Sequence, residues 1–410
     1  MTRLFWFRSR ILIACLVFIV LFAVSSELHL HLMLRRRLAL LLSKASDPEP
    51  EIHHADSVYS EKLIKSFPLR ERKRTPRKKY QPPNVTILMW TKFYNTTTLI
   101  TELKGAAPLP QWCEVTFDRV LITTSQAVIF HMPEKEFNWS DLPSHRSSEQ
   151  IWVFFSLESP AYTDQNVSLL NGLTFNRTMT YRLDSDFPAP CGFVTKRSMP
   201  LLNHHLPQLT NKTGAVVWMC RHCETDSKRE KLVKELKKYI PIDTYSHCGE
   251  FFSEPEDELG CYQTLGERYK FYLAFETSIC TDYITGQFTN ALYANLVPVV
   301  YGGGNYDRIV PRKAYINVQH FGSPAALARY LRFLDLNHQE YLKYFEWKKH
   351  LNLHIRQGLN GFRLICQAIQ KGNLQENRSY ADIGKWWSQG HCRYGEQWLK
   401  GPTSLPTKYN

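Results

Sequence analysis

Outside its first 80 residues, this 410-residue sequence has little net charge. Residues 1–80 hold 16 of the 51 lysines and arginines but only 7 of the 38 acidic residues, which accounts for +9 of the formal net charge of +13. A nucleic-acid-binding protein needs its basic residues gathered on the folded surface. The body of the chain lacks that excess, so we expect no nucleic-acid partner. The basic run from Lys65 to Lys79 is typical of a solvated linker.

Long apolar runs are also scarce, and the longest lies near the N-terminus. Ile11–Val24 is uninterrupted and follows three arginines. With its apolar and small neighbours it is long enough to span a thin bilayer, and the preceding basic residues place that end in the cytoplasm. We predict a cytoplasmic tail over residues 1–10 and a transmembrane anchor over 11–26. A cleaved signal peptide is the alternative, because Ala23–Ser25 fits a cleavage site.

Acceptor sites for N-glycans are absent from the first 80 residues and frequent afterwards. Asn-x-Ser/Thr begins at Asn84, Asn95, Asn138, Asn166, Asn176, Asn211 and Asn377. Of the ten cysteines, only Cys15 lies in the predicted anchor. Both patterns indicate that the body lies in the lumen of the secretory pathway, where disulfides persist. The other nine cysteines are an odd number, so at least one thiol is left without a partner within the chain.

The chain divides into a stem and two domains. Residues 27–83 are charged, contain prolines and lack sustained periodicity, which indicates a stem. The folded body begins at Asn84, where VTILMW predicts a buried strand. A break at 212–214 separates a domain over 84–212 from one over 213–350. Residues 351–410 form a C-terminal helix and a disulfide-bearing tail.

Strand-like runs mark the first domain and alternate with helical patterns in the second. In the first, strands are expected at Val120–Thr123, Ala127–Phe130 and Ile151–Leu157. In the second, strands are expected at Ala215–Met219 and Ile240–Tyr245. This pattern predicts an α/β fold with two facing Rossmann-like domains, each built on a parallel sheet.

Helix starts in the second domain are marked by capping residues. Ser227 with Glu230 is a capping box, and Ser323-Pro324 combines a cap with proline in the first turn. Thr285 begins a further helix-and-strand unit that ends at Tyr301. A helix start after a strand attracts phosphate, because its backbone N–H groups have no partner in the helix.

Residues 275–303 contain the most specific motif, FETSICTDYITGQFTNALYANLVPVVYGG. An acidic and aromatic cluster, a helix start, an apolar strand and a glycine turn follow one another, as in the nucleotide-binding crevice of an open α/β sheet. The block resembles the FENSxCxDYxTEK signature of the α-1,3-fucosyltransferases, especially arthropod members. The resemblance extends from about Asn84 to Cys392.

The resemblance assigns roles to particular residues. Glu158 follows the apolar strand WVFFSL, where a carboxylate can serve as a base. SLESP resembles the family segment that carries the catalytic base, which makes Glu158 the catalytic residue. SKREKLVKEL resembles the segment whose arginine contacts the donor diphosphate, so Arg229 takes that role. By the same resemblance Tyr283 packs against guanine and Glu276 orients the donor.

Three positions depart from the family pattern. Thr277 replaces Asn, Gly286 replaces Glu and Gln287 replaces Lys. Gln287 can still donate a hydrogen bond, and Thr285 can still cap a helix that attracts phosphate. Each lost charged hydrogen bond costs on the order of 1.5–3 kcal/mol, or about tenfold to a hundredfold in turnover or donor affinity.

Two other motifs suggest metals. Asp184-Ser185-Asp186 matches a metal-nucleotide motif of a different transferase fold, but it lies in YRLDSD, which resembles a fucosyltransferase segment, so a structural or acceptor-side role is expected. Cys220 and Cys223, with Cys248 and Cys261, match a zinc site, but disulfides are favoured in the lumen. Cys366 and Cys392 are expected to pair.

The sequence therefore predicts a two-domain GT-B glycosyltransferase, a single-pass type II protein of the Golgi stack with a lumenal catalytic domain. The resemblance implies inverting transfer of L-fucose from GDP-β-L-fucose to O3 of GlcNAc in glycoprotein glycans. The first domain would face the acceptor and the second would bind the donor. No cofactor is expected, and a divalent cation is at most stimulatory. Gly286 and Gln287 favour one alternative, a weakened or inactive relative that binds glycans or partner transferases.

Overall fold

The computed structural model describes most of the chain after residue 83. The described residues are 84–94, 98–106, 108–132, 141–163, 175–201, 206–245, 247–248, 258–355, 357–372, 379–393 and 395. The predicted tail, anchor and stem lie outside them and stay predictions. No helix in these ranges is long and apolar enough to cross a membrane.

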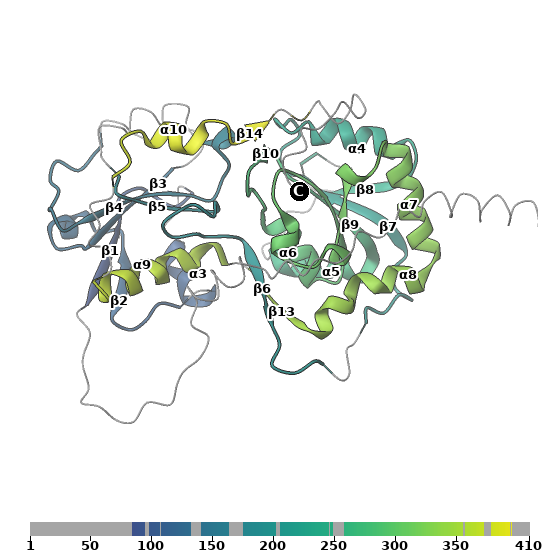
Figure 1. The fold of residues 1–410 in the computed structure, drawn as a ribbon, viewed down its shortest axis with the longest axis horizontal. Helices are drawn as coiled ribbons and strands as arrows, with labels where there is room; N and C mark the ends of the chain where they lie inside the picture. The colour runs from purple at the N-terminus through teal and green to yellow at the C-terminus, as the bar shows by residue number, and fades with distance from the viewer. Residues whose placement is uncertain are drawn as a thin grey trace, which may run out of the picture. The chain divides into compact units, whose positions relative to one another are not determined.

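The first sheet has five parallel strands in the order β2-β1-β3-β4-β5 (Figure 1). Its strands are β1 (Val85–Met89), β2 (Cys113–Thr116), β3 (Ala127–His131), β4 (Ile151–Ser156) and β5 (Arg177–Thr180). Every residue of β4, IWVFFS, is buried. A continuous apolar run of this kind is typical of a central parallel strand that is covered on both faces.

Helices from both ends of the described chain cover this sheet. On one face, Ile87 and Val153 pack in a cluster with Leu103 of α3 (Leu99–Ala106) and Phe362 of α9 (Asn360–Gln370). On the other face, Phe154 packs in a cluster with Trp387 of α10 (Ile383–Ser388). The C-terminal helices therefore complete the core of the first sheet.

The second sheet also has five parallel strands, in the order β12-β11-β9-β7-β8. Its strands are β7 (Gly214–Met219), β8 (Ile242–Tyr245), β9 (Tyr269–Phe275), β11 (Val297–Tyr301) and β12 (Ile316–Asn317). All residues of β9 and β11 are buried. The predicted α/β fold with parallel sheets is confirmed.

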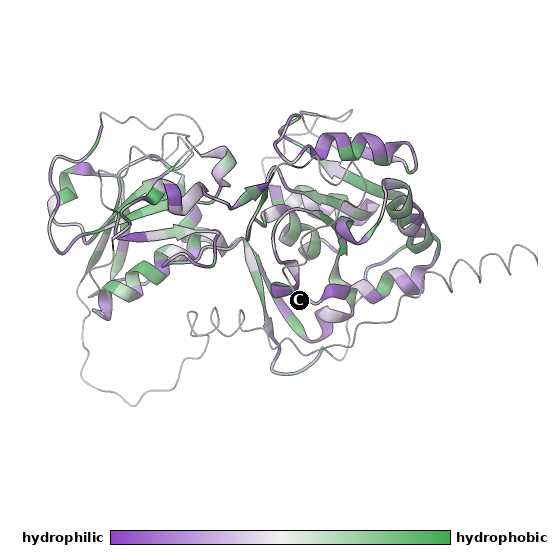
Figure 2. Cartoon of the chain, turned by 45° about the horizontal axis from the view of Figure 1, so that its top comes forward, coloured by the Kyte–Doolittle hydropathy of each residue, from purple (hydrophilic) through white to green (hydrophobic). Residues whose placement is uncertain are grey.

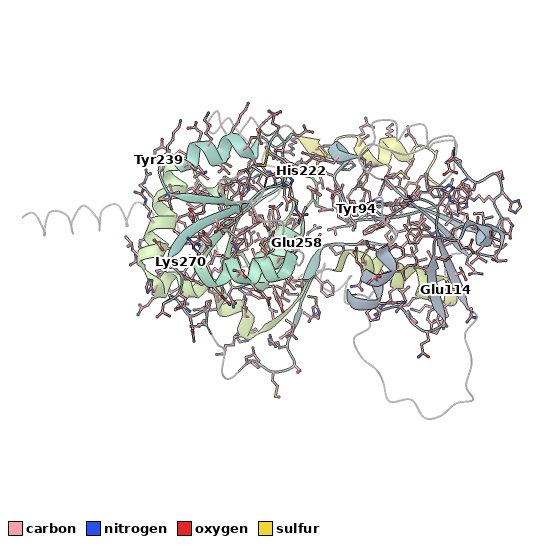
Figure 3. The ribbon with its side chains drawn as sticks, turned by 180° about the vertical axis from the view of Figure 1, so that it is seen from behind. Tyr94, Glu114, His222, Tyr239, Glu258 and Lys270 are labelled. Carbon is pink, nitrogen blue, oxygen red and sulfur yellow. A yellow bond between two sulfur atoms is a disulfide. The ribbon has the colours of Figure 1, made fainter. Side chains whose placement is uncertain are left out.

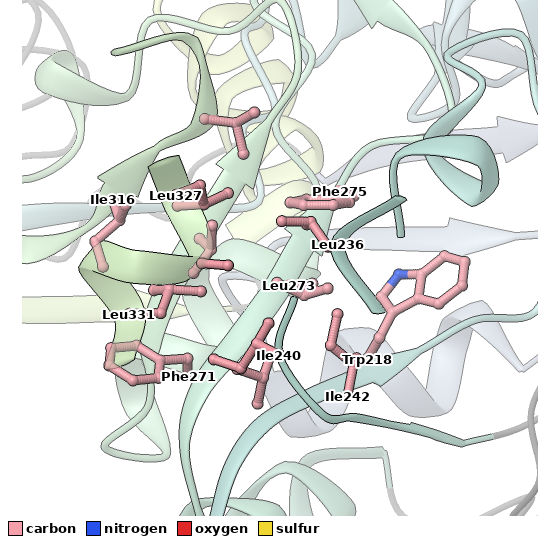
Figure 4. Packing of buried hydrophobic residues seen from close by; sticks show 14 of the residues in the cluster. Trp218, Leu236, Ile240, Ile242, Phe271, Leu273, Phe275, Ile316, Leu327 and Leu331 are labelled. Carbon is pink, nitrogen blue, oxygen red and sulfur yellow. The ribbon is translucent and has the colours of Figure 1, made fainter. Parts of the chain in front are cut away.

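Two pairs of helices cover the two faces of the second sheet. On one face, α4 (Arg229–Lys237) and α7 (Pro324–Leu336) bury Leu236, Leu327 and Leu331 against Phe271 and Leu273 of β9 (Figure 4). On the other face, α5 (Glu258–Arg268) and α6 (Gly286–Tyr293) pack in a second cluster. In Figure 2, hydrophobic residues gather on the strands, whereas the helices carry both hydrophobic and hydrophilic residues.

The predicted start of α7 is confirmed. Ser323 is its N-cap, and the side-chain oxygen of Ser323 accepts a hydrogen bond from the Ala326 backbone at 3.2 Å. Pro324 occupies the first turn, where its missing N–H has no helical partner to lose. Leu327, Leu331 and Leu334 then follow at helical spacing and are buried.

Short elements connect these layers. The antiparallel pairs are β6 (Gly192–Lys196) with β13 (Leu351–Ile355) and β10 (Ile279–Cys280) with β14 (Cys392–Arg393). In the described residues, the remaining helical elements are α8 (His338–Leu342) and the 3₁₀ turns Arg119–Thr123, Pro160–Tyr162, Tyr306–Arg308, Arg312–Ala314, Val318–His320, Lys343–Lys349 and Gln357–Leu359. The strand predicted at Val120–Thr123 is wrong. Asp118 accepts a hydrogen bond from the Val120 backbone and caps a 3₁₀ turn there.

One cysteine pairing differs from the pairing expected from the sequence. The disulfides in the described residues are Cys113–Cys366, Cys223–Cys248 and Cys280–Cys392. The expected Cys366–Cys392 pair is wrong, because α9 carries Cys366 to strand β2 whereas β14 pairs with β10 and brings Cys392 to Cys280. Among the described residues, Cys191, Cys220 and Cys261 form no disulfide. Cys223 forms a disulfide with Cys248, so these two cysteines do not take part in the zinc site that the spacing suggested.

Candidate functional site

Most of the predicted site residues line one cavity of about 230 Å³. From the first half of the body it is lined by Glu158 and Tyr162. From the second half its lining consists of Met219, Arg221, His222, Arg229, Glu258, Tyr262, Tyr272, Thr277, Tyr283, Thr285, Gly286 and Gln287. Parallel strands of an open α/β sheet place ligand crevices at their carboxyl ends, which is where Glu158, Met219 and Thr277 lie.

Glu158 lies two residues after β4, and two tyrosines hold its carboxylate. The Tyr283 hydroxyl donates to Oε2 at 2.9 Å, and the Tyr94 hydroxyl donates to Oε1 at 3.3 Å. The neighbouring residue ties the two halves of the body together, because buried Ser159 donates a hydrogen bond to buried Ser278 at 2.8 Å. The carboxylate is therefore held in the cavity wall by partners from both halves.

Tyr94 has a strained backbone that aims its ring at Glu158. Its φ of 46° lies in the left-handed region that a bulky residue rarely adopts. The ring packs edge-on against Phe93 and His131 and remains 43% exposed. Beneath it, burial lowers the pKa of His131 to about 4, so that imidazole stays neutral.

Tyr283 is more deeply buried than the predicted contact with guanine requires. Its side chain is 2% exposed, and its ring lies 5.0 Å from the ring of Tyr181. Burial raises its pKa well above the usual range, so the hydroxyl stays protonated and donates a hydrogen bond to Glu158. The structure therefore connects Tyr283 to the carboxylate, and the guanine contact stays a prediction.

Arg229 lies at the predicted place but is held mainly by backbone carbonyls. It is 2% exposed. Its guanidinium donates to the Phe275 carbonyl at 2.5 Å and to the His222 carbonyl at 3.4 Å. Its Nε makes no hydrogen bond to any residue that the structure describes. The charge of Arg229 is thus fixed at the cavity, with one buried donor unused.

The predicted capping box before Arg229 is wrong. Ser227 donates to the Glu276 carbonyl at 2.7 Å instead of capping the helix. Lys228 is the N-cap, with a φ of 54° and no side-chain capping bond. Glu230 accepts a hydrogen bond from Thr225 at 3.0 Å. Ser227 therefore links the start of α4 to the end of β9.

Glu276 is completely buried beneath the start of α6. Its Oε1 accepts a hydrogen bond from the Thr285 backbone at 2.9 Å. Its Oε2 has no hydrogen-bond partner among the described residues. Burial raises its pKa from 4.5 to about 7, against the opposing effect of the Thr285 hydrogen bonds. Glu276 is therefore partly protonated near neutral pH.

The start of α6 has the predicted cap but neither the Glu nor the Lys of the family pattern. Thr285 is the N-cap, and its side chain accepts from the Gln287 backbone at 3.4 Å, as predicted. A Cβ on Gly286 would lie 3.4 Å from Asn290 Nδ2, which is ordinary contact, so an alanine fits here. The buried Oε1 of Gln287 has no hydrogen-bond partner in the described chain. The first turn carries no acidic residue.

The aspartates of the Asp-x-Asp motif are engaged within the fold. Asp184 forms an ion pair with Arg182 at 2.5 Å. Asp186 accepts hydrogen bonds from the Thr178 backbone at 2.8 Å and from the Tyr380 hydroxyl at 2.9 Å. Within the described ranges, no three His, Cys, Asp or Glu side chains are grouped for a metal.

Half of the residues that line the cavity were not predicted from the sequence. Figure 3 labels two of the missed residues, His222 and Glu258, which come from the end of β7 and the start of α5. The missed residues are Tyr162, Met219, Arg221, His222, Glu258, Tyr262 and Tyr272. The rule that ligands bind at the carboxyl ends of strands marks Arg221 and His222 as clearly as Glu158. No local signal marks Glu258 and Tyr262, because they lie on α5 and tertiary packing brings that helix to the cavity.

Two family models match the chain. Residues 209–386 match the profile "Glycosyltransferase family 10 (fucosyltransferase) C-term", and residues 82–192 match "Fucosyltransferase, N-terminal". The chain belongs to glycosyltransferase family 10. This confirms the family resemblance predicted from the 275–303 block.

Curated relatives come from vertebrates and insects. The chain is 34% identical to 4-galactosyl-N-acetylglucosaminide 3-alpha-L-fucosyltransferase 9 of Rattus norvegicus over 306 residues, 74% of this chain and 82% of that protein. It is 31% identical to alpha-(1,3)-fucosyltransferase C of Drosophila melanogaster over 356 residues, 79% of this chain and 82% of that protein. A crystal structure of an alpha1,3-fucosyltransferase covers 76% of this chain and 94% of its own, with 14% identity and a TM-score of 0.47.

Proposed function

We propose that this family 10 member is an active, inverting α-1,3-fucosyltransferase. The donor is GDP-β-L-fucose, and the acceptor is O3 of a GlcNAc in a glycoprotein glycan. The observation that carries the proposal is that Glu158 lies in one cavity with Arg229 and the capped start of α6. A base and two diphosphate-binding elements are what this transfer requires.

Glu158 acts as the base. It removes the proton from the acceptor O3–H as that oxygen attacks the anomeric carbon of fucose. The bond from that carbon to the β-phosphate oxygen breaks, GDP leaves, and the β-linked donor becomes an α-linked product. The hydrogen bonds from Tyr94 and Tyr283 orient the carboxylate for this transfer.

The diphosphate is neutralised by the start of α6 and by Arg229. Backbone N–H groups at the first turn of a helix point at a bound anion and carry partial positive charge. Thr285 and Gln287 contribute at this end, and the Arg229 guanidinium supplies a full charge. Glu276 fixes the Thr285 backbone and orients the donor side of the cavity. Because its pKa is about 7, its repulsion of the phosphates is reduced below neutral pH.

The same proposal covers the architecture and the location. We infer a GT-B arrangement with the acceptor on the side of the first sheet and GDP-fucose on the side of the second. We also infer a type II protein of the Golgi membrane with its body in the lumen, supported by the apolar run 11–24 and the glycan acceptor sites. We infer chemistry without a required metal, because the α6 start and Arg229 supply the positive charge.

A transfer assay tests the proposal. Purified full-length protein is incubated with GDP-fucose and a panel of glycans that present either galactose-substituted or core GlcNAc, and the product linkage is determined. Fucose on O3 in α linkage supports the proposal, and the preferred glycan identifies the acceptor. Absence of transfer to every GlcNAc-bearing glycan overturns it. If the protein binds GDP with micromolar affinity but transfers no fucose, and the double substitution Gly286→Glu with Gln287→Lys does not restore transfer, the inactive alternative holds.

A further inference from the structure

The start of α6 offers backbone N–H groups but no positively charged side chain to a bound diphosphate. Gly286 and Gln287, the first two residues of the helix, are both uncharged. The arginines and lysines that line the cavity are Arg221 and Arg229. Arg229 is 2% exposed and is held by the carbonyls of Phe275 and His222. Its guanidinium cannot follow the donor without breaking those bonds.

Arg221 is free to contact the donor. It lies two residues after β7, an inner strand of the second sheet, and its side chain is exposed in the cavity lining. Within the described part of the chain it forms no ion pair and donates no side-chain hydrogen bond. The next residue, His222, accepts the Arg229 hydrogen bond, so the backbone that carries Arg221 is anchored beside Arg229.

We propose that Arg221 is the residue that neutralises the β-phosphate of the bound nucleotide, in place of a charged side chain on α6. The proposal rests on the proposed function, because it names a further donor-binding residue for the same cavity. A guanidinium binds phosphate oxygens with two parallel N–H donors, which suits an exposed side chain at a crevice. Arg229 then supplies fixed charge and Arg221 supplies charge that closes on the donor.

Glu258 offers a competing explanation for Arg221. Its carboxylate also lines the cavity, at the first residue of α5, and it has the opposite charge. If Arg221 served only to neutralise Glu258, Arg221→Gln would leave GDP binding unchanged in a Glu258→Gln background, because no carboxylate would remain to be neutralised. If Arg221 binds phosphate, Arg221→Gln weakens GDP binding in that background as well.

Calorimetric titration of the full chain with GDP and with GMP tests the proposal. Arg221→Gln is expected to weaken GDP binding about tenfold to a hundredfold, because one charged hydrogen-bonding partner is lost. GMP lacks the β-phosphate, so its affinity is expected to change by less than about threefold, well under one charged hydrogen bond. Arg221→Lys keeps the charge and should restore most of the GDP affinity. Lys234→Gln, in the following helix α4 and outside the cavity lining, is the control.

Adding Gln287→Lys to Arg221→Gln sharpens the test. A lysine on α6 should restore at least about tenfold in GDP affinity to the double variant, and should add less to the wild type, because both charges serve one phosphate. Equal GDP affinity in Arg221→Gln and the wild type would overturn the proposal, and so would an equal loss for GDP and GMP. A wild-type protein that binds no GDP would overturn the proposed function itself.

Discussion

The carboxylates of Glu158 and Glu276 lie around the same cavity and have different surroundings. Glu158 is half-buried and receives two tyrosine hydroxyls. Glu276 is fully buried, with one oxygen hydrogen-bonded to a backbone N–H and the other without a partner in the described residues. Carboxyl groups with contrasting environments take different chemical roles in one site. We assign proton removal to Glu158 and support of the α6 start to Glu276.

Removing the Tyr283 hydroxyl tests whether it positions Glu158. Tyr283→Phe keeps the ring and deletes the 2.9 Å hydrogen bond. Because hydrogen bonds to charged groups contribute about 1.5–3 kcal/mol, kcat is expected to fall about tenfold to a hundredfold. KM for GDP-fucose should stay unchanged, and the pH profile of kcat should shift because a hydrogen bond to the base is lost. A raised KM with unchanged kcat would instead support the guanine contact predicted from the sequence.

Glu276 makes stability depend on pH. Its folded-state pKa of about 7 exceeds the ordinary 4.5, so between these values the folded protein binds more protons than the unfolded chain. Stability contributed by this group therefore falls as pH rises through that window, by about 3 kcal/mol in total. Glu276→Gln keeps an acceptor for the Thr285 N–H and removes the titration. The variant's stability relative to wild type should rise over this window in urea unfolding.

His131 is present in the wild type and in Glu276→Gln, and it changes stability with pH in the opposite direction to Glu276. Its pKa of about 4 lies below the ordinary 6.5, so its contribution to stability is lost as pH falls. Only the difference between Glu276→Gln and the wild type isolates the carboxyl group. A difference that stays constant across the window would contradict the raised pKa of Glu276.

At the scale of elements, the helix α6 shows what the sequence could and could not predict. Its cap, Thr285, and the following strand were predicted because a capping residue and an apolar run are local signals. The Ser227 cap was predicted by the same reasoning and was wrong, because the Glu276 carbonyl competes for its hydroxyl. That competitor lies 49 residues away along the chain. Local patterns do not report such a partner.

Gly286 tests whether the start of α6 tolerates a side chain. A Cβ there makes only ordinary contact with Asn290, so Gly286→Ala should stabilise the protein by about 0.4–1 kcal/mol through lower entropy of the unfolded chain. GDP binding should not change, because the backbone N–H groups remain. Gly372→Ala is the control. Its φ of 63° strains any other residue, so it should destabilise the protein. Equal destabilisation by both variants would contradict the assigned geometry.

On the scale of the whole molecule, the C-terminal segment completes the core of the first sheet. Phe362 and Cys366 of α9 pack with strands β1, β3 and β4, and Trp387 of α10 packs on the other face. The sequence predicted a C-terminal helix but not its partner, because contacts between residues so distant along the chain leave no periodic signal. The same limit explains the wrong cysteine pairing, since spacing alone does not identify partners.

The Cys113–Cys366 disulfide should contribute strongly to stability. It joins residues separated by 253 positions and ties α9 to β2. Replacing both cysteines by alanine should lower the free energy of unfolding by about 2–5 kcal/mol. Amide hydrogen exchange in α9 should accelerate as well. Cys261→Ala removes a thiol that forms no disulfide and serves as the control. A loss no larger than that of the control would show that packing alone holds α9.

Fucose transfer by Glu158→Gln, measured beside GDP binding, tests most directly whether Glu158 is the base. Glu149→Gln, an exposed position shortly before the same strand, is the control. We predict that Glu158→Gln lowers kcat about a hundredfold to ten-thousandfold, as expected for loss of a general base, while GDP affinity and stability stay at wild-type values. Transfer by Glu158→Gln at the wild-type rate would contradict the assignment of Glu158 as the base.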